Sequence, residues 1–233
     1  DILAGARLEF EAMGAEIVGG HTIVGPRMEL GFTVIGSVRR TNPIRKDRVR
    51  PSDRLYLTKP LGIGVLLAAH MRCQCRGVDY EALVSSMLQR QHPWAKAAIE
   101  NEIVAGTDIT GFGLAGHLLE MLDSSGASAT ISLSSLPALG GALEAFDEGI
   151  ESSLAPANRT AEASVDATPS CRKQAAYQLL FDPQTCGGLL YSVPPSREDA
   201  FLADASSAGL DPPSLIGIAD KGTDANTPLR VEE

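Results

Sequence analysis

The chain has 233 residues, of which 44% are hydrophobic and 21% are charged, and its formal net charge is −9. This composition is typical of a globular protein rather than of a disordered or fibrous chain. The acidic balance disfavours nucleic acid as a partner, because binding its phosphates needs a basic surface. The most apolar window, 61–71, is shorter than a bilayer requires, so we expect no membrane partner.

The sequence of the first part of the chain predicts one helix and two strands, which are followed by a basic segment. Residues 3–14 space their apolar side chains as a helix does and end at a glycine. Residues 15–21 predict a short strand that runs into a Gly-Gly turn, and 30–38 are rich in strand-forming residues. Residues 39–53 then hold six basic residues and two prolines. We interpret this run as a domain boundary with a solvated surface.

Beyond the boundary, strands and helices alternate. Strands are expected at 54–62, 128–136 and 213–220, and helices at 63–72, 79–90, 93–101, 110–122, 140–149 and 196–209. The polar stretch 150–175 predicts a loop. The alternation indicates an α/β fold with a mixed α+β sheet. We expect a remnant of an N-terminal domain over 1–50, a C-terminal α/β domain over 51–222 and a tail over 223–233.

Gly111, Gly113 and Gly116 have the G-x-G-x-x-G spacing of loops that bind a dinucleotide. Such a site also needs an acidic residue at the end of the next strand. The strand expected over 128–136 ends in serines and a leucine instead. The sequence therefore disfavours a dinucleotide cofactor.

Asp108 stands just before these glycines, and two interpretations of it are open. Its side chain, or that of Thr110, can cap the first turn of the following helix. Alternatively, its carboxylate lies at the mouth of a strand–helix turn and holds Mg²⁺ against a phosphate, while the glycines expose backbone amides. An acidic protein that handles ATP needs such a cation to offset charge repulsion.

Four segments carry a resemblance to a known family. They are GGHTIVGP (19–26), LTKPLGIG (57–64), DITGFGLAGHLLEM (108–121) and LLFDPQTCGGLL (179–190). Their order resembles that of the selenophosphate synthetases (selenide, water dikinases), members of the ATP-binding superfamily that includes aminoimidazole ribonucleotide synthetase. The resemblance implies the C-terminal domain of that superfamily, preceded by a remnant of the N-terminal domain.

This resemblance also implies an activity and a site. In that family, ATP, selenide and water give selenophosphate, AMP and phosphate, with Mg²⁺ on the phosphates. Asp108 is then one of several metal-binding aspartates. Gly19, Gly20 and His21 form a segment shared across a homodimer, where they touch the ATP of the partner subunit.

The family's reactive Cys or selenocysteine, its lysine and further aspartates belong to an N-terminal segment that this sequence does not contain. We therefore assign no catalytic residue and expect the chain alone to be inactive. Cys171, beside Arg172 and Lys173, is the only candidate substitute nucleophile. The alternatives are a superfamily relative that acts on another nucleophile, and a non-catalytic dimerisation or regulatory module.

The remaining cysteines, histidines and lysines receive structural interpretations. Four cysteines without a zinc-type arrangement indicate a reducing, cytoplasmic setting. His117 lies in an apolar helix and is interpreted as a hydrogen-bonded packing residue. Cys186 replaces the serine that is usual in its segment and is interpreted as packing. Lys59 follows a strand, where lysines are usually solvated, and is left unassigned.

Overall fold

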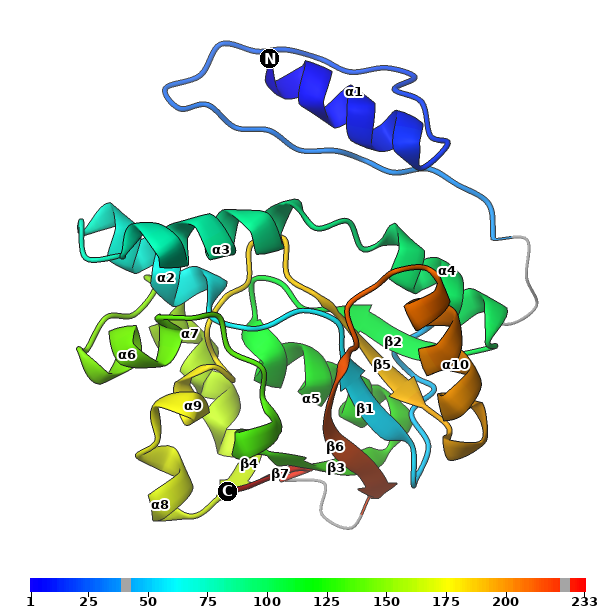
Figure 1. Cartoon of the computed structure of the whole chain (residues 1–233), viewed down its shortest axis with the longest axis vertical. Helices are drawn as coiled ribbons and strands as arrows, with labels where there is room; N and C mark the ends of the chain where they lie inside the picture. The colour runs from blue at the N-terminus through cyan, green and yellow to red at the C-terminus, as the bar shows by residue number, and fades with distance from the viewer. Residues whose placement is uncertain (39–42, 223–226) are drawn as a thin grey trace. The chain divides into compact units, whose positions relative to one another are not determined.

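The computed structural model describes residues 1–38, 43–222 and 227–233, and the chain divides into two units, Asp1–Thr41 and Asn42–Glu233 (Figure 1). The division falls inside the basic run 39–53, but the second unit begins before the expected residue 51. Arg45 accounts for the difference. Its N–H donates to the carbonyl of Val104 at 2.8 Å, and its carbonyl accepts from the N–H of Gly106 at 3.0 Å.

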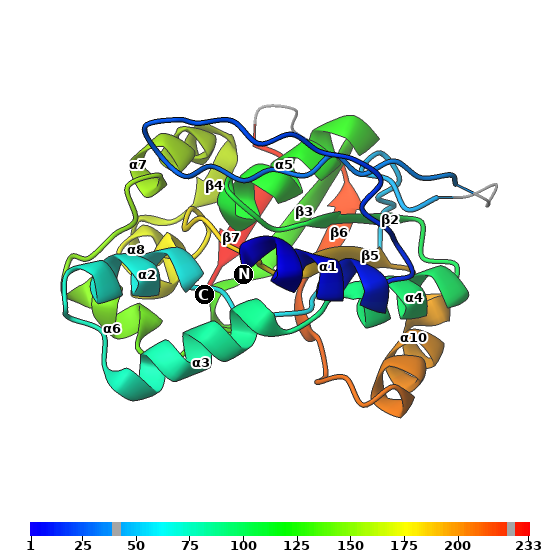
Figure 2. The same cartoon turned by 90° about the horizontal axis from the view of Figure 1, so that it is seen from above.

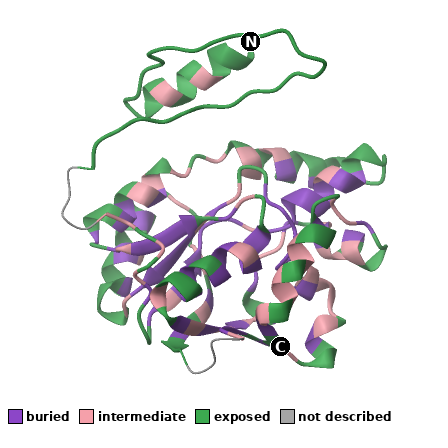
Figure 3. Ribbon diagram, turned by 180° about the vertical axis from the view of Figure 1, so that it is seen from behind, coloured by how far each residue is buried: buried purple, intermediate pink, exposed green. Residues whose placement is uncertain are grey.

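The first unit contains one helix, α1 (Ile2–Ala12), among its described residues. Phe10 of α1 packs edge-on against Phe32, with the ring centroids 5.1 Å apart. The strands predicted over 15–21 and 30–38 do not form in the described residues, so that prediction was wrong. A strand needs a neighbour to pair its backbone groups, and no other part of the described chain pairs with these segments. No described residue of this unit is buried (Figure 3).

The second unit is built on a mixed sheet of seven strands in the order β2-β5-β1-β6-β3-β7-β4 (Figure 1). The strands are β1 (Arg54–Leu57), β2 (Ala105–Asp108), β3 (Ala127–Ser132), β4 (Val165–Ala167), β5 (Leu189–Val193), β6 (Ser214–Lys221) and β7 (Leu229–Glu232). Neighbours from β2 to β3 pair antiparallel, whereas β7 pairs parallel with both β3 and β4.

The α-helices of this unit and two short 3₁₀ turns connect these strands. They are α2 (Ile63–Met71), α3 (Gly77–Leu88), α4 (His92–Glu100), α5 (Gly113–Ser125), α6 (Ala142–Asp147), α7 (Ala155–Asn158), α8 (Pro169–Arg172), α9 (Ala175–Gln178), α10 (Pro195–Ser207), η1 (Leu133–Ser135) and η2 (Arg159–Ser164). None of the helices in the described ranges has the length and hydropathy that a bilayer-spanning helix requires.

Helices cover both faces of the sheet (Figures 1 and 2). On one face, Leu55 and Leu57 of β1 share a core with the apolar side of α5. On the other face, Tyr56 of β1 belongs to a core with Trp94 of α4 and Phe201 of α10. Successive residues of β1 therefore serve opposite cores, as the pleat of a strand requires. A third cluster joins α2, α3 and α6 beside the sheet.

Two stretches that the sequence predicted as irregular contain regular structure. The expected tail 223–233 includes β7, although residues 223–226 lie outside the described ranges. Leu229 and Val231 are buried and alternate with exposed residues, which is the pattern of a strand with one covered face. The expected loop 150–175 contains the short elements α7, η2, β4 and α8.

Candidate functional site

Three of the sequence segments that carry the resemblance meet where β1 and β2 end and β5 begins. Both β1 and β2 pair antiparallel with β5, so their last residues lie beside its first. The backbone of the loop after β2 is tied to the segment before β5, because the N–H of Ile109 donates to the carbonyl of Gly188 at 2.8 Å. The segments 57–64, 108–121 and 179–190 thus form one continuous site.

Asp108 is the exposed last residue of β2. Its carboxylate accepts hydrogen bonds from the hydroxyl of Thr110 at 3.2 Å and from that of Thr107 at 3.4 Å. Neither Asp108 nor Thr110 caps the following helix: the cap position of α5 is Phe112, and no side chain bonds the first turn. The capping interpretation was therefore wrong, and the carboxylate remains open to solvent.

An exposed carboxylate flanked by hydroxyls suits a hard cation such as Mg²⁺, which prefers oxygen ligands. Among the described residues, however, no group of three or more His, Cys, Asp or Glu side chains is placed to hold a metal ion. Asp108 can therefore serve as one ligand of Mg²⁺, and further ligands are needed to complete the coordination of the ion.

Two of the three glycines after Asp108, Gly113 and Gly116, allow close packing within the protein. Gly113 has a φ of +70°, and a Cβ there would lie 2.8 Å from the carbonyl oxygen of Leu180. A Cβ on Gly116 would lie 2.8 Å from that of Phe112. Moreover, β2 and β3 are not neighbours in the sheet, unlike the strands of a dinucleotide-binding unit.

Asp182 and Gln184 hold the N-terminus of α2, a role that the sequence analysis missed. The Asp182 carboxylate accepts from the N–H of Gly64 at 2.9 Å and from the side-chain amide of Gln184 at 3.0 Å. The amide oxygen of Gln184 accepts from the N–H of Ile63 at 3.1 Å. Both side chains are buried. They supply the acceptor oxygens that the unpaired N–H groups of a helix N-terminus need.

Lys59 is buried rather than solvated, contrary to what its position after β1 suggested. It is 2% exposed, and its ammonium donates to the carbonyl oxygen of Cys186 at 2.9 Å. Burial lowers the pKa of Lys59. Gly188 permits this arrangement, because a Cβ there would lie 2.8 Å from the backbone nitrogen of Lys59. Lys59 thus fixes the turn that leads into β5.

His117 lies on the buried side of α5, as a packing residue would. Its Nε2 is 3.2 Å from the hydroxyl of Thr110, while its Nδ1 has no hydrogen-bond partner among the described residues. Burial lowers the pKa of His117 and favours the neutral ring. The ring supports the hydroxyl that in turn bonds Asp108.

The other sequence-predicted groups lie apart from these contacts. Gly19, Gly20 and His21 are exposed residues of the first unit, and their binding role stays a prediction. Cys171, the candidate substitute nucleophile, is 1% exposed in α8, so it is poorly placed to attack a substrate. Cys186 is the exposed thiol near the site and has a φ of +56°.

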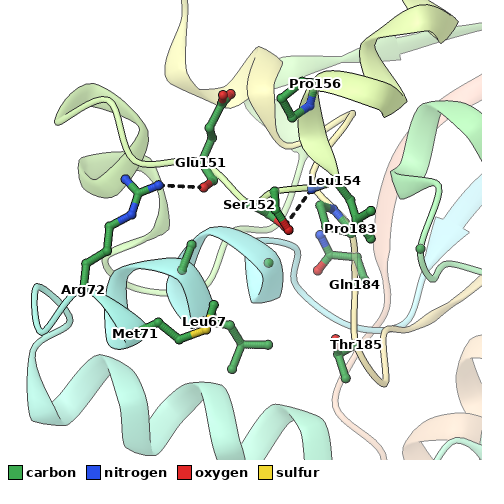
Figure 4. A pocket seen from close by; sticks show the side chains of 14 residues that line it. Leu67, Met71, Arg72, Glu151, Ser152, Leu154, Pro156, Pro183, Gln184 and Thr185 are labelled. Carbon is green, nitrogen blue, oxygen red and sulfur yellow. Dashed lines mark hydrogen bonds between the residues drawn. The ribbon is translucent and has the colours of Figure 1, made fainter. Parts of the chain in front are cut away.

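A pocket of about 500 Å³ opens beside this site (Figure 4). Residues of α2, of the stretch 151–156 and of 183–185 line it. Gly111, in the loop after Asp108, also lines it. The pocket and the candidate metal ligand therefore share one loop.

Comparison with known proteins connects this geometry to a family. Residues 50–227 match the family model described as AIR synthase related protein, C-terminal domain. The selenide, water dikinase of Bordetella bronchiseptica is 37% identical over 210 residues, which are 90% of this chain and 60% of that protein. That of Pseudomonas aeruginosa is 36% identical over 211 residues, with the same coverage. The chain thus spans about 60% of the length of these curated relatives.

Solved structures share the fold at low sequence identity. A thiamine-monophosphate kinase from Stenotrophomonas maltophilia superposes with a TM-score of 0.57 at 21% identity, covering 83% of this chain and 54% of that one. The hydrogenase maturation protein HypE of E. coli superposes with a TM-score of 0.59 at 19% identity, covering 84% of this chain and 51% of that one. This chain belongs to the family of AIR synthase related proteins, with residues 50–227 as the C-terminal domain of that family.

Proposed function

We propose that this chain is the C-terminal part of an ATP-dependent phosphotransferase that makes selenophosphate from selenide, ATP and water, with release of AMP and phosphate. The observation that supports this proposal most directly is that the segments 57–64, 108–121 and 179–190 meet around Asp108, where β1 and β2 end and β5 begins. The relatives named selenide, water dikinase, which match along 90% of the chain, support this choice of reaction. Two solved structures support ATP as the phosphate donor. One is HypE in complex with ATP, and the other is a thiamine monophosphate kinase (ThiL) with AMPPCP and TMP.

In this proposal, Asp108 binds Mg²⁺, which offsets the negative charge of the ATP phosphates when bound. The hydroxyls of Thr107 and Thr110 orient the carboxylate, and buried His117 supports Thr110. Companion ligands come from outside the described residues, because these contain no three-ligand group.

Gly19, Gly20 and His21 are proposed to reach the ATP of a partner subunit in a homodimer. A Cβ on either glycine would meet no atom within 4 Å, so their backbone is open to a ligand. The four cysteines are free, which suits a reducing cytoplasm.

Asp108→Asn in the intact protein tests the metal role. The amide oxygen of asparagine still accepts from one of the two threonine hydroxyls, and its NH₂ group can donate to the other, but the side chain lacks the charge that a hard cation needs. We expect Mg²⁺-dependent AMP release from ATP and selenide to fall at least about tenfold, which is ~1.4 kcal/mol of lost transition-state stabilisation. The melting temperature should stay close to that of the wild type. Unchanged turnover together with an unchanged calorimetric affinity for Mg·ATP would refute the assignment.

The chain 1–233 alone should form no selenophosphate. Its candidate thiol Cys171 is buried, and Asp108 lacks companion carboxylates among the described residues. We expect nucleotide binding on the order of millimolar at best, equivalent to about 4 kcal/mol. AMP release from ATP and selenide is the measurement. Robust AMP formation that Cys171→Ser or Cys186→Ser abolishes would show that the chain carries its own nucleophile.

A further inference from the structure

The pocket beside Gly111 combines an apolar wall with polar groups toward its ends (Figure 4). The side chains of the wall come from Leu67, Ala68, Met71, Leu154, Pro156 and Pro183. Arg72 lies toward one end beside Glu151, and Thr185 lies toward the other. The volume of about 500 Å³ falls in the range of small-molecule sites, which is roughly 300–1,000 Å³.

The guanidinium of Arg72 has no carboxylate partner among the described residues. The guanidinium donates one long hydrogen bond, 3.4 Å, to the backbone carbonyl of Glu151. The carboxylate of Glu151 pairs instead with Arg159 at 2.7 Å. Most of the donors of Arg72 therefore remain available, in a chain whose net charge is −9. A guanidinium with free donors favours a carboxylate or phosphate, which it can bind in a bidentate manner.

Contacts within the protein itself fix the segments that line the pocket. The side-chain amide of Asn158 donates to the carbonyls of Gly111 at 2.8 Å and Phe181 at 2.9 Å. Gly64 lets α2 approach the opposite wall, because a Cβ there would lie 2.5 Å from the carbonyl oxygen of Pro183. The site is therefore preformed, so a ligand would not need to order it first.

Two apolar side chains at the rim of the pocket are exposed to water, which is unfavourable in free energy. Met71 is 78% exposed and Leu154 is 53% exposed. An apolar ring placed over them would remove this surface from water. We propose that the pocket binds a small organic anion with an aromatic body, the acid group on Arg72 and the ring between Met71 and Leu154. This site goes beyond the proposed reaction and does not depend on it.

The test uses the chain 1–233 and 1-naphthyl phosphate, an aromatic phosphomonoester whose fluorescence reports binding. We expect Arg72→Ala to weaken binding at least about tenfold, the loss of a charge-assisted contact. Met71→Ala should weaken it by a smaller factor. Arg50→Ala, a matched change at an exposed arginine outside the pocket, should leave the dissociation constant unchanged. Equal melting temperatures would show that the variants fold.

Ligand controls separate the parts of the proposed recognition. 1-Naphthol lacks the anion and inorganic phosphate lacks the ring, so each should bind much more weakly than 1-naphthyl phosphate. Ser153→Trp places a large side chain in the pocket and should abolish binding. The proposal is overturned if Arg72→Ala and Ser153→Trp bind as the wild type does, or if the wild type does not bind at millimolar concentration. It is also overturned if Asp108→Asn, rather than Arg72→Ala, removes binding.

Discussion

The carboxylate of Asp182 is fully buried, and its Oδ1 has no hydrogen-bond partner among the described residues. Burial raises the pKa of Asp182 from 3.8 to about 7. The unfolded chain therefore releases this proton near pH 4, whereas the folded chain keeps it until about pH 7. Between these values the folded state binds more protons, so this group makes the free energy of unfolding fall as pH rises. Through this group the free energy of unfolding falls by at most about 1.4 kcal/mol per pH unit.

Asp182→Asn should remove this pH dependence. Asparagine can accept from Gly64 and Gln184 with its amide oxygen and does not ionise, so the variant should gain stability relative to the wild type between about pH 4 and pH 7. Urea unfolding followed by the fluorescence of buried Trp94 measures the difference across this range. Asp199→Asn, at an exposed position, is the control. Parallel stability curves for the wild type and Asp182→Asn would contradict the prediction.

The sequence predicted where Asp108 lies but not that Lys59 and Asp182 are buried, and the reason is physical. The place of Asp108 between a strand and a helix follows from local spacing, and the structure agrees. Lys59 and Asp182 look like surface residues locally, one after a strand and the other before a proline. Their burial arises because 179–190 folds against 57–64, a contact between distant parts of the chain that local patterns do not encode.

Helix α2 depends on a close approach to the segment before β5. A Cβ on Gly64 would lie 2.5 Å from the carbonyl oxygen of Pro183 and 2.6 Å from Oδ1 of Asp182. We expect Gly64→Ala to destabilise the protein by about 1–3 kcal/mol, the usual cost of overpacking. Gly77→Ala in α3 is the matched control, since a Cβ there would meet nothing within 4 Å. It should be neutral or stabilising by up to about 1 kcal/mol in urea unfolding. Equal effects of the two substitutions would argue against the contact.

Elements with strong local patterns were predicted well, and those that depend on neighbours were not. The helices expected at 63–72 and 93–101 match α2 and α4 within a residue or two at each end. The short strands β4 and β7 were missed because each is only a few residues long and is stabilised by pairing in the sheet. The same dependence explains the opposite error at 30–38, whose strand-forming residues find no pairing partner among the residues that the structure describes.

The two units differ in how they bury apolar surface. The second unit has cores on both faces of its sheet, while the first has no buried described residue and exposes large apolar side chains such as Val18, Val24 and Ile35. Exposed apolar surface of this kind favours association with other chains. The stability of the second unit should therefore come from its own residues, and the self-association of the chain from the first unit.

A truncated chain, 43–233, tests this division of roles. It keeps Arg45 and its backbone bonds to the edge of β2, so its unfolding midpoint in urea should match that of 1–233 when followed by Trp94 fluorescence. Light scattering after size exclusion should show larger particles for 1–233 than for 43–233, because only the longer chain carries the exposed apolar segments. If 43–233 unfolds at lower urea, the first unit contributes packing to the second. If both chains are equally monodisperse monomers, the apolar side chains of the first unit are covered within a single chain.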